Sequence, residues 1–116
     1  MNPQVKEKWV NALRSGDYKQ TTGNLYEPGV GYCCLGVLTD LYLKEKGLEW
    51  DSPAPESGWV CFEDEFEFLP TSVMQWADLK DNRGTYDNVI ESPALTDLND
   101  NGVSFNEIAD VIESKF

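Results

Sequence analysis

The spacing of apolar residues predicts two long helices in the first half of the chain. Val5, Trp9 and Leu13 fall on one face of a helix over about 3–15. From Cys33 to about residue 46 the spacing is helical again, and the glycine that follows is a typical C-terminal stop. This second helix is the most apolar of the chain, so we expect it at the centre of the core.

Three further helices are predicted in the second half. A proline opens a short helix over 69–77, and a Ser-Pro pair opens a small helix over 92–98. The last helix begins at Ser104, whose hydroxyl is a typical N-cap, with Glu107 as its capping-box partner. The apolar stripe of this helix contains Phe105, Ile108, Val111 and Ile112.

Two short runs predict a β-hairpin in the middle of the chain. The runs 59–62 and 65–68 flank Glu63-Asp64. The second run alternates acidic and aromatic residues, as a strand with one buried face does, so its two phenylalanines are expected to point inward. A further short strand is predicted over 88–90.

Proline and glycine mark the loops. Residues 27–30, Glu-Pro-Gly-Val, predict a type II turn, and residues 51–58, with two prolines and two serines, predict a loop. Helices and strands interleave along the chain. We therefore predict an α+β fold: a single compact domain over 1–116 in which about five helices pack on a small antiparallel sheet.

Charge narrows the classes of partner. The formal net charge is −12, and residues 47–79 hold eight acids and no Lys or Arg. Such a surface repels nucleic acid and anionic membranes, so neither is expected as a partner. The acids either keep the surface soluble or form a face that docks on a basic protein. The candidate contact residues are Trp50, Glu63, Asp64, Glu65 and Glu67.

Three features predict a cytosolic protein. The chain lacks an apolar run near the twenty residues of a membrane span, and its first residues lack the pattern of a signal peptide. Cys33 and Cys34 are adjacent, so a bond between them would be strained, and only Cys61 remains as a partner for either. Reduced thiols are expected, as in the cytosol.

The segment from Asp97 onward nearly matches a calcium-binding EF-hand loop. Asp97, Asn99 and Asn101 occupy loop positions 1, 3 and 5, and a glycine occupies position 6. The required glutamate at position 12 is instead Ile108, with a glutamate one residue early. The capped helix described above accounts for every residue of the second half, so we favour it over a calcium site.

A cysteine at a helix N-terminus can be activated as a thiolate, which makes Cys33 and Cys34 candidate nucleophiles. Thiol hydrolases pair such a cysteine with histidine, and this chain has no histidine. The favoured interpretation is that both cysteines are small apolar residues, with Gly36 allowing close packing. Zinc sites also need Cys or His at regular spacing, so no cofactor is expected.

Several segments together resemble a family of small proteins found in tailed-phage genomes. They are residues 8–16, residues 32–38 with the helix start Cys-Cys-Leu-Gly-Val-Leu, and residues 98–109 with Leu-Asn-Asp and Ser-Phe-Asn-Glu-Ile-Ala. Residues 69–77 resemble the family as well. The resemblance implies a phage origin and expression in a bacterium, but no settled activity and no catalytic residue. Residues 48–68 match no pattern of that family, so individual members would specialise there.

The leading functional hypothesis is a phage accessory protein that binds a bacterial host protein through the acidic hairpin and the Trp50 loop. The second is a pocket that sequesters a small metabolite or nucleotide, although an anionic ligand would need Lys or Arg, and the chain has few. A thiol-dependent enzyme and a calcium-binding module remain as further hypotheses.

Overall fold

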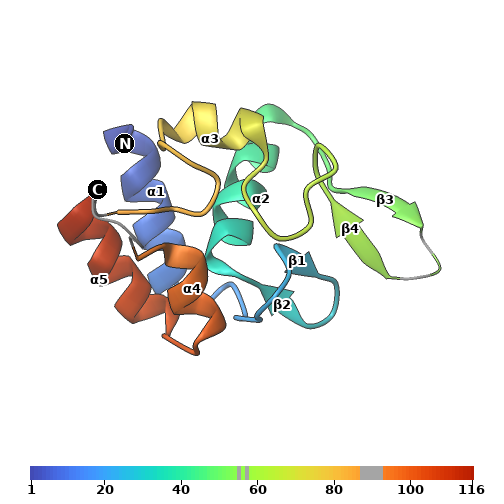
Figure 1. Cartoon of the computed structure of the whole chain (residues 1–116). Helices are drawn as coiled ribbons and strands as arrows, with labels where there is room; N and C mark the ends of the chain where they lie inside the picture. Colours follow the sequence, from blue (N-terminus) through green and yellow to red (C-terminus); the bar gives the residue numbers. More distant parts are fainter. Residues whose placement is uncertain (55, 57, 87–92) are drawn as a thin grey trace.

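The computed structural model describes residues 1–54, 56, 58–86 and 93–116. The described helices and strands confirm the α+β class (Figure 1). The helices are α1 (Pro3–Arg14), α2 (Cys34–Lys46), α3 (Thr71–Ala77), α4 (Leu95–Asp100) and α5 (Phe105–Lys115). The strands are β1 (Tyr26–Glu27), β2 (Gly31–Tyr32), β3 (Asp51–Ala54) and β4 (Trp59–Cys61).

The core is mainly helical. α1 packs along α5, so the two ends of the chain lie side by side, and α2 contacts α1, α3 and α4 (Figure 1). Every residue from Cys34 to Asp40 of α2 is buried. The first half of α2 is thus enclosed on all sides, which confirms its predicted central position and explains its nearly continuous apolar sequence.

The strands are antiparallel, as predicted, but they form two separate hairpins and not one small sheet. β1 pairs with β2, and β3 pairs with β4, all antiparallel. The turn between β1 and β2 is the predicted type II turn: the N–H of Val30 donates to the carbonyl of Glu27 at 3.0 Å, and Gly29 has φ +82°. The β3–β4 hairpin extends away from the helices (Figure 1).

The pairing of the middle segment differs from the prediction. Residues 51–54, expected in a loop, form β3 and pair with β4, whereas residues 65–68 form no strand. The predicted turn at Glu63-Asp64 is present, with φ of 52° and 63°, and the two flanking residues exchange backbone hydrogen bonds. The pairing stops there because the carbonyl of Phe66 accepts from the N–H of Leu25 at 2.7 Å instead of from a neighbouring strand.

The helix starts show which predicted caps are correct. Ser104 caps α5 as predicted: its Oγ accepts from the N–H of Glu107 at 3.2 Å. The carboxylate of Glu107 accepts from the Ser104 hydroxyl rather than from the backbone. α4 begins at Leu95, later than predicted, and Ser92 and the predicted strand 88–90 lie outside the described residues.

None of the helices in the described part of the chain combines the length and the apolar character that a membrane span requires.

Candidate functional site

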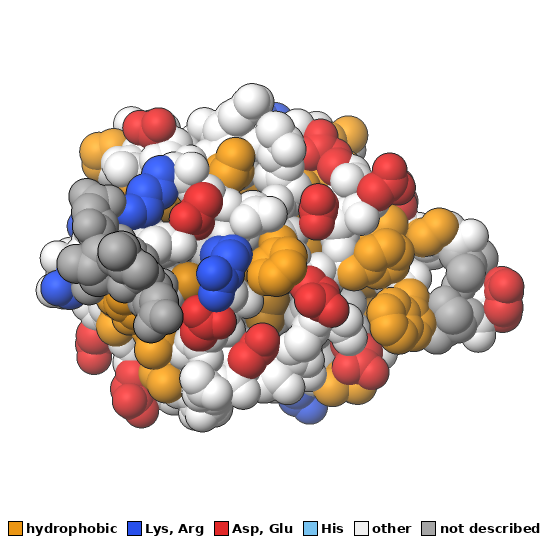
Figure 2. Space-filling view, in the orientation of Figure 1, with side chains coloured by type: hydrophobic (Ala, Val, Ile, Leu, Met, Phe, Trp, Pro, Cys, Tyr) orange, Lys and Arg blue, Asp and Glu red, His pale blue; other side chains and the backbone are white. Residues whose placement is uncertain are grey.

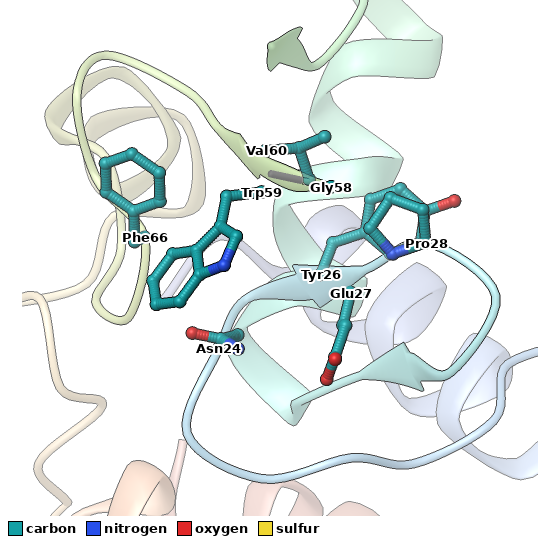
Figure 3. A pocket seen from close by; sticks show the side chains of 8 residues that line it. All are labelled: Asn24, Tyr26, Glu27, Pro28, Gly58, Trp59, Val60 and Phe66. Atoms are coloured by element: carbon teal, nitrogen blue, oxygen red, sulfur yellow. The ribbon is translucent and has the colours of Figure 1, made fainter. Parts of the chain in front are cut away.

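A cleft lies between the two hairpins, where β4 approaches β1. Its volume is about 190 Å³, and segments far apart in the sequence form its walls (Figure 3). The type II turn after β1 provides one wall, and β4 with the segment after Glu65 provides the other. The lining residues are Asn24, Tyr26, Glu27, Pro28, Gly58, Trp59, Val60 and Phe66.

Three aromatic residues line this cleft, Tyr26, Trp59 and Phe66. The side chain of Trp59 is 57% exposed, the largest exposure of any large hydrophobic residue described. Its indole meets the ring of Phe66 edge to face, with centroids 6.0 Å apart. Tyr26 is held from behind by a parallel stack on Tyr32, with centroids 4.2 Å apart. The cleft therefore presents an exposed tryptophan beside a phenylalanine, while the ring of Tyr26 extends toward Pro28 (Figure 3).

The segment that provides β4 and Phe66 to the cleft is rich in acidic residues. No ion pair between described residues involves any of the eight acids of residues 47–79. Hydrophobic side chains gather over the base of the β3–β4 hairpin, with acidic side chains around them (Figure 2). This region therefore combines apolar contact area with uncompensated negative charge.

The predicted contact acids have different roles in the structure. Glu63 is used internally: its carboxylate accepts from the backbone N–H of Ser72 at 2.9 Å and from its hydroxyl at 2.5 Å. Glu63 thus caps α3, whose own N-cap residue is a proline without a capping side chain. Glu65 is half-buried, and Asp64 and Glu67 are exposed.

Trp50, expected as an exposed contact residue, is half-buried. Its indole N–H donates to the Oδ1 of Asp40 at 3.1 Å, and its ring lies 5.4 Å from that of Tyr26. Sequence reasoning placed Trp59 in a strand but did not identify it as the exposed tryptophan. No local signal separates the two residues, because their exposure depends on which strands pair.

The buried carboxylate of Asp40 joins several segments. Its Oδ2 accepts from the hydroxyl of Tyr18 at 2.7 Å and pairs with Lys44 at 2.9 Å, while its Oδ1 accepts from Trp50. Burial, followed by the hydrogen bond to Asp40, raises the pKa of Tyr18 to about 12. Because its oxygens already have partners, Asp40 fixes the segments on either side of α2 and is not free for catalysis.

The two cysteines at the start of α2 are buried. The Sγ of Cys33 accepts from the N–H of Gly36 at 3.4 Å, and the Sγ of Cys34 donates to the carbonyl of Leu95 at 3.6 Å. Burial raises the pKa of Cys33 to about 11 and that of Cys34 well above its ordinary value. Hydrogen bonds from nearby backbone N–H groups lower both pKa values, but by less than burial raises them. Both thiols are therefore protonated at neutral pH.

Gly36 packs closely, as predicted. A Cβ at this position would lie 1.6 Å from the carbonyl oxygen of Leu25. The backbone of α2 therefore lies directly against the segment that leads into β1.

Cys34 also joins α1, α2 and α4 through its backbone. Its carbonyl accepts from the indole N–H of Trp9 at 3.0 Å, and its N–H donates to the Oδ1 of Asn99 at 3.1 Å. The side chain of Asn99 also donates to the carbonyl of Thr21 at 2.8 Å and accepts from Gln20 at 3.0 Å. Trp9, Cys34 and Asn99 thus hold α1, α2 and α4 together, which is a structural role.

The three calcium-ligand candidates do not converge. Asp97 pairs with Arg83 at 2.8 Å, Asn99 is fully buried with both ends of its amide in use, and Asn101 is the exposed C-cap of α4. Within the described ranges, no group of three His, Cys, Asp or Glu residues could hold a metal ion.

Several cations that a nucleotide pocket would need are already paired with acids. Arg14 is bound to Asp110 at 2.5 Å and to Glu113 at 2.6 Å, and Lys8 is bound to Glu45 at 2.9 Å. These pairs neutralise two of the three cations of α1, Lys8 and Arg14, which does not favour a pocket for an anion built on that helix.

Comparison with known protein families identifies a match over the length of the chain. A family model described as a domain of unknown function, DUF8296, matches residues 1–116. No curated protein and no solved structure matches the chain. Because the family model covers residues 1–116, the chain belongs to the family of the domain of unknown function DUF8296.

Proposed function

We propose that this protein is a non-catalytic binding protein that engages a bacterial protein through its hairpin face. The hairpin face is the cleft between the two hairpins together with Asp64 and Glu67, two exposed acids of the segment that follows β4. The observation that carries the proposal is the exposed indole of Trp59 in the wall of this cleft.

An exposed tryptophan beside other aromatic rings is typical of a contact residue. Trp and Tyr are enriched among the residues that dominate binding energy at interfaces, where they fill a partner's pocket and are surrounded by a polar rim. The rim here is acidic, so it attracts a basic partner and accelerates its association. A soluble chain gains nothing in stability from exposing an indole, which favours a role in contact.

The bacterial setting comes from the resemblance to phage proteins. A phage accessory protein acts where it is made, so the partner is proposed to lie in the bacterial cytosol. A thiol enzyme and a calcium module are disfavoured by the buried, protonated cysteines and by the occupied amide of Asn99.

The test is capture from a bacterial lysate by the tagged chain, read by mass spectrometry for proteins and retained small molecules. The wild-type chain is expected to retain one protein in stoichiometric amount. Trp59→Ala should weaken binding by roughly thirtyfold or more, the effect of a central contact residue. Leu48→Ala is the matched control, because Leu48 is 46% exposed but does not line the cleft, and it should bind normally.

A second pair of variants tests the acidic rim. Glu67→Lys should weaken capture, whereas Glu7→Lys, an equal change of charge on the exposed side of α1, should not. Equal capture by wild type and Trp59→Ala would contradict the proposal. So would a retained small molecule without a protein partner, which would favour the sequestration hypothesis.

A further inference from the structure

The cleft of the hairpin face combines the two kinds of group that recognise a guanidinium: aromatic rings and a carboxylate. Trp59, Tyr26 and Phe66 supply the rings, and Glu27 supplies the negative charge. Arginine differs from lysine in that its planar cation stacks on aromatic faces and binds a carboxylate through two N–H groups at once. We infer that the cleft receives an arginine side chain of the partner, an inference that rests on the proposed binding function.

The charge of the cleft is uncompensated. Glu27 is exposed and is the only charged residue among those that line the cleft. No ion pair within the described part of the chain involves Glu27. Any group that covers the cleft must therefore pair with this carboxylate or leave it desolvated, which is costly.

The arrangement of the rings fits a flat cation. Phe66 lies on one side of the Trp59 indole, and the side chain of Glu27 lies on the other, where β1 forms the opposite wall (Figure 3). Both hairpins hold their residues by backbone pairing, and the stack on Tyr32 fixes Tyr26 from behind. The aromatic surface is therefore largely preformed, so an incoming side chain need not order it.

Other occupants fit less well. An anionic group meets Glu27 and a net charge of −12, and an apolar side chain would bury the carboxylate without a partner. A lysine pairs with the carboxylate but has no planar group to stack. The volume of about 190 Å³ also lies below the roughly 300–1,000 Å³ of typical small-molecule pockets, which favours a single side chain.

The test uses three capped peptides of sequence Gly-Ser-X-Ser-Gly, where X is arginine, lysine or citrulline. Citrulline keeps the shape of arginine but is neutral. The peptides are titrated into the intact protein, and binding is followed by NMR at the indole N–H of Trp59 and the backbone N–H of Glu27. The arginine peptide should shift both signals and bind roughly tenfold more tightly than the citrulline peptide.

Variants locate the effect. Glu27→Gln should weaken the arginine peptide by up to about fivefold, and Trp59→Leu, which keeps an apolar side chain but removes the ring, should abolish the preference for arginine over citrulline. Glu7→Gln is the matched control and should change nothing. Dispersed NMR signals confirm that each variant is folded.

Equal binding of the arginine and citrulline peptides, or of the arginine and lysine peptides, would overturn the inference. NMR chemical-shift changes confined to acidic residues outside the cleft would overturn it as well. These failures are distinct from failure of the proposed function. If Trp59→Ala loses capture while the peptides show no preference, the binding face stands and the arginine assignment falls. If Trp59→Ala captures normally, the binding face itself falls.

Discussion

Replacing Asn99 by alanine should destabilise the protein more than any other substitution of an asparagine on the C-terminal helices. Its fully buried amide accepts from the backbone N–H of Cys34 and donates to the carbonyl of Thr21. Alanine can do neither. The perturbation therefore removes a junction between α4, the start of α2 and the segment that follows α1.

The magnitude follows from what each partner loses. The N–H of Cys34 lies in a fully buried residue, so leaving it without an acceptor costs about 1–3 kcal/mol. Thr21 is half-buried, and its carbonyl loses one ordinary hydrogen bond, about 1 kcal/mol. Gln20 keeps its bond to the carbonyl of Val103. The expected loss is about 2–4 kcal/mol, a large part of the roughly 5–15 kcal/mol that stabilises a typical domain.

Urea unfolding followed by tryptophan fluorescence measures this loss. With a slope of about 1–3 kcal/mol per M, the midpoint should fall by roughly 1–3 M. Asn106→Ala is the matched control: Asn106 is exposed on α5, and its substitution should change the free energy of unfolding by no more than about 0.5 kcal/mol. If both variants unfold at the same midpoint, the junction contributes nothing and the reasoning is refuted. Calcium should leave the wild-type midpoint unchanged.

Four further predictions concern single residues. Glu63→Ala should cost about 1 kcal/mol by uncapping α3, whereas Asp64→Asn should cost little; equal midpoints in urea would contradict this. Native Cys33 should react with iodoacetamide at pH 7 far more slowly than a free thiol, and as fast only after unfolding. Gly36→Ala should yield little folded protein by circular dichroism, because its Cβ would overlap a backbone carbonyl. The pKa of Tyr18 is raised from 10.0 to about 12 in the folded protein. The stability that Tyr18 contributes is therefore complete below pH 10 and is lost as the pH rises towards 12. Urea titrations of Tyr18→Phe across this pH range should show a smaller loss of stability than those of the wild type.

Local patterns determined the helices of this protein. The apolar spacing around Trp9 and the cap at Ser104 predict their helices correctly, because each depends on residues within a few positions of one another. The two-residue turn at Glu63-Asp64 and the type II turn before β2 were correct for the same reason.

The candidate site could not be read in the same way. Trp50 and Trp59 flank the same proline-containing segment, 51–58, and only tertiary contacts make one a partner of Asp40 and the other an exposed wall of the cleft. Glu63 looked like a contact acid until the fold placed it at the start of α3.

The sequence by itself determined the α+β class, the central apolar helix and the acidic charge of the middle segment, since these follow from composition and short-range periodicity. Only the tertiary structure decided which strands pair, which tryptophan is exposed and where a cleft forms. The pairing of β3 with β4 and the approach of β4 to β1 join residues across many positions of the chain. Strand pairing depends on such distant contacts, which local spacing does not encode.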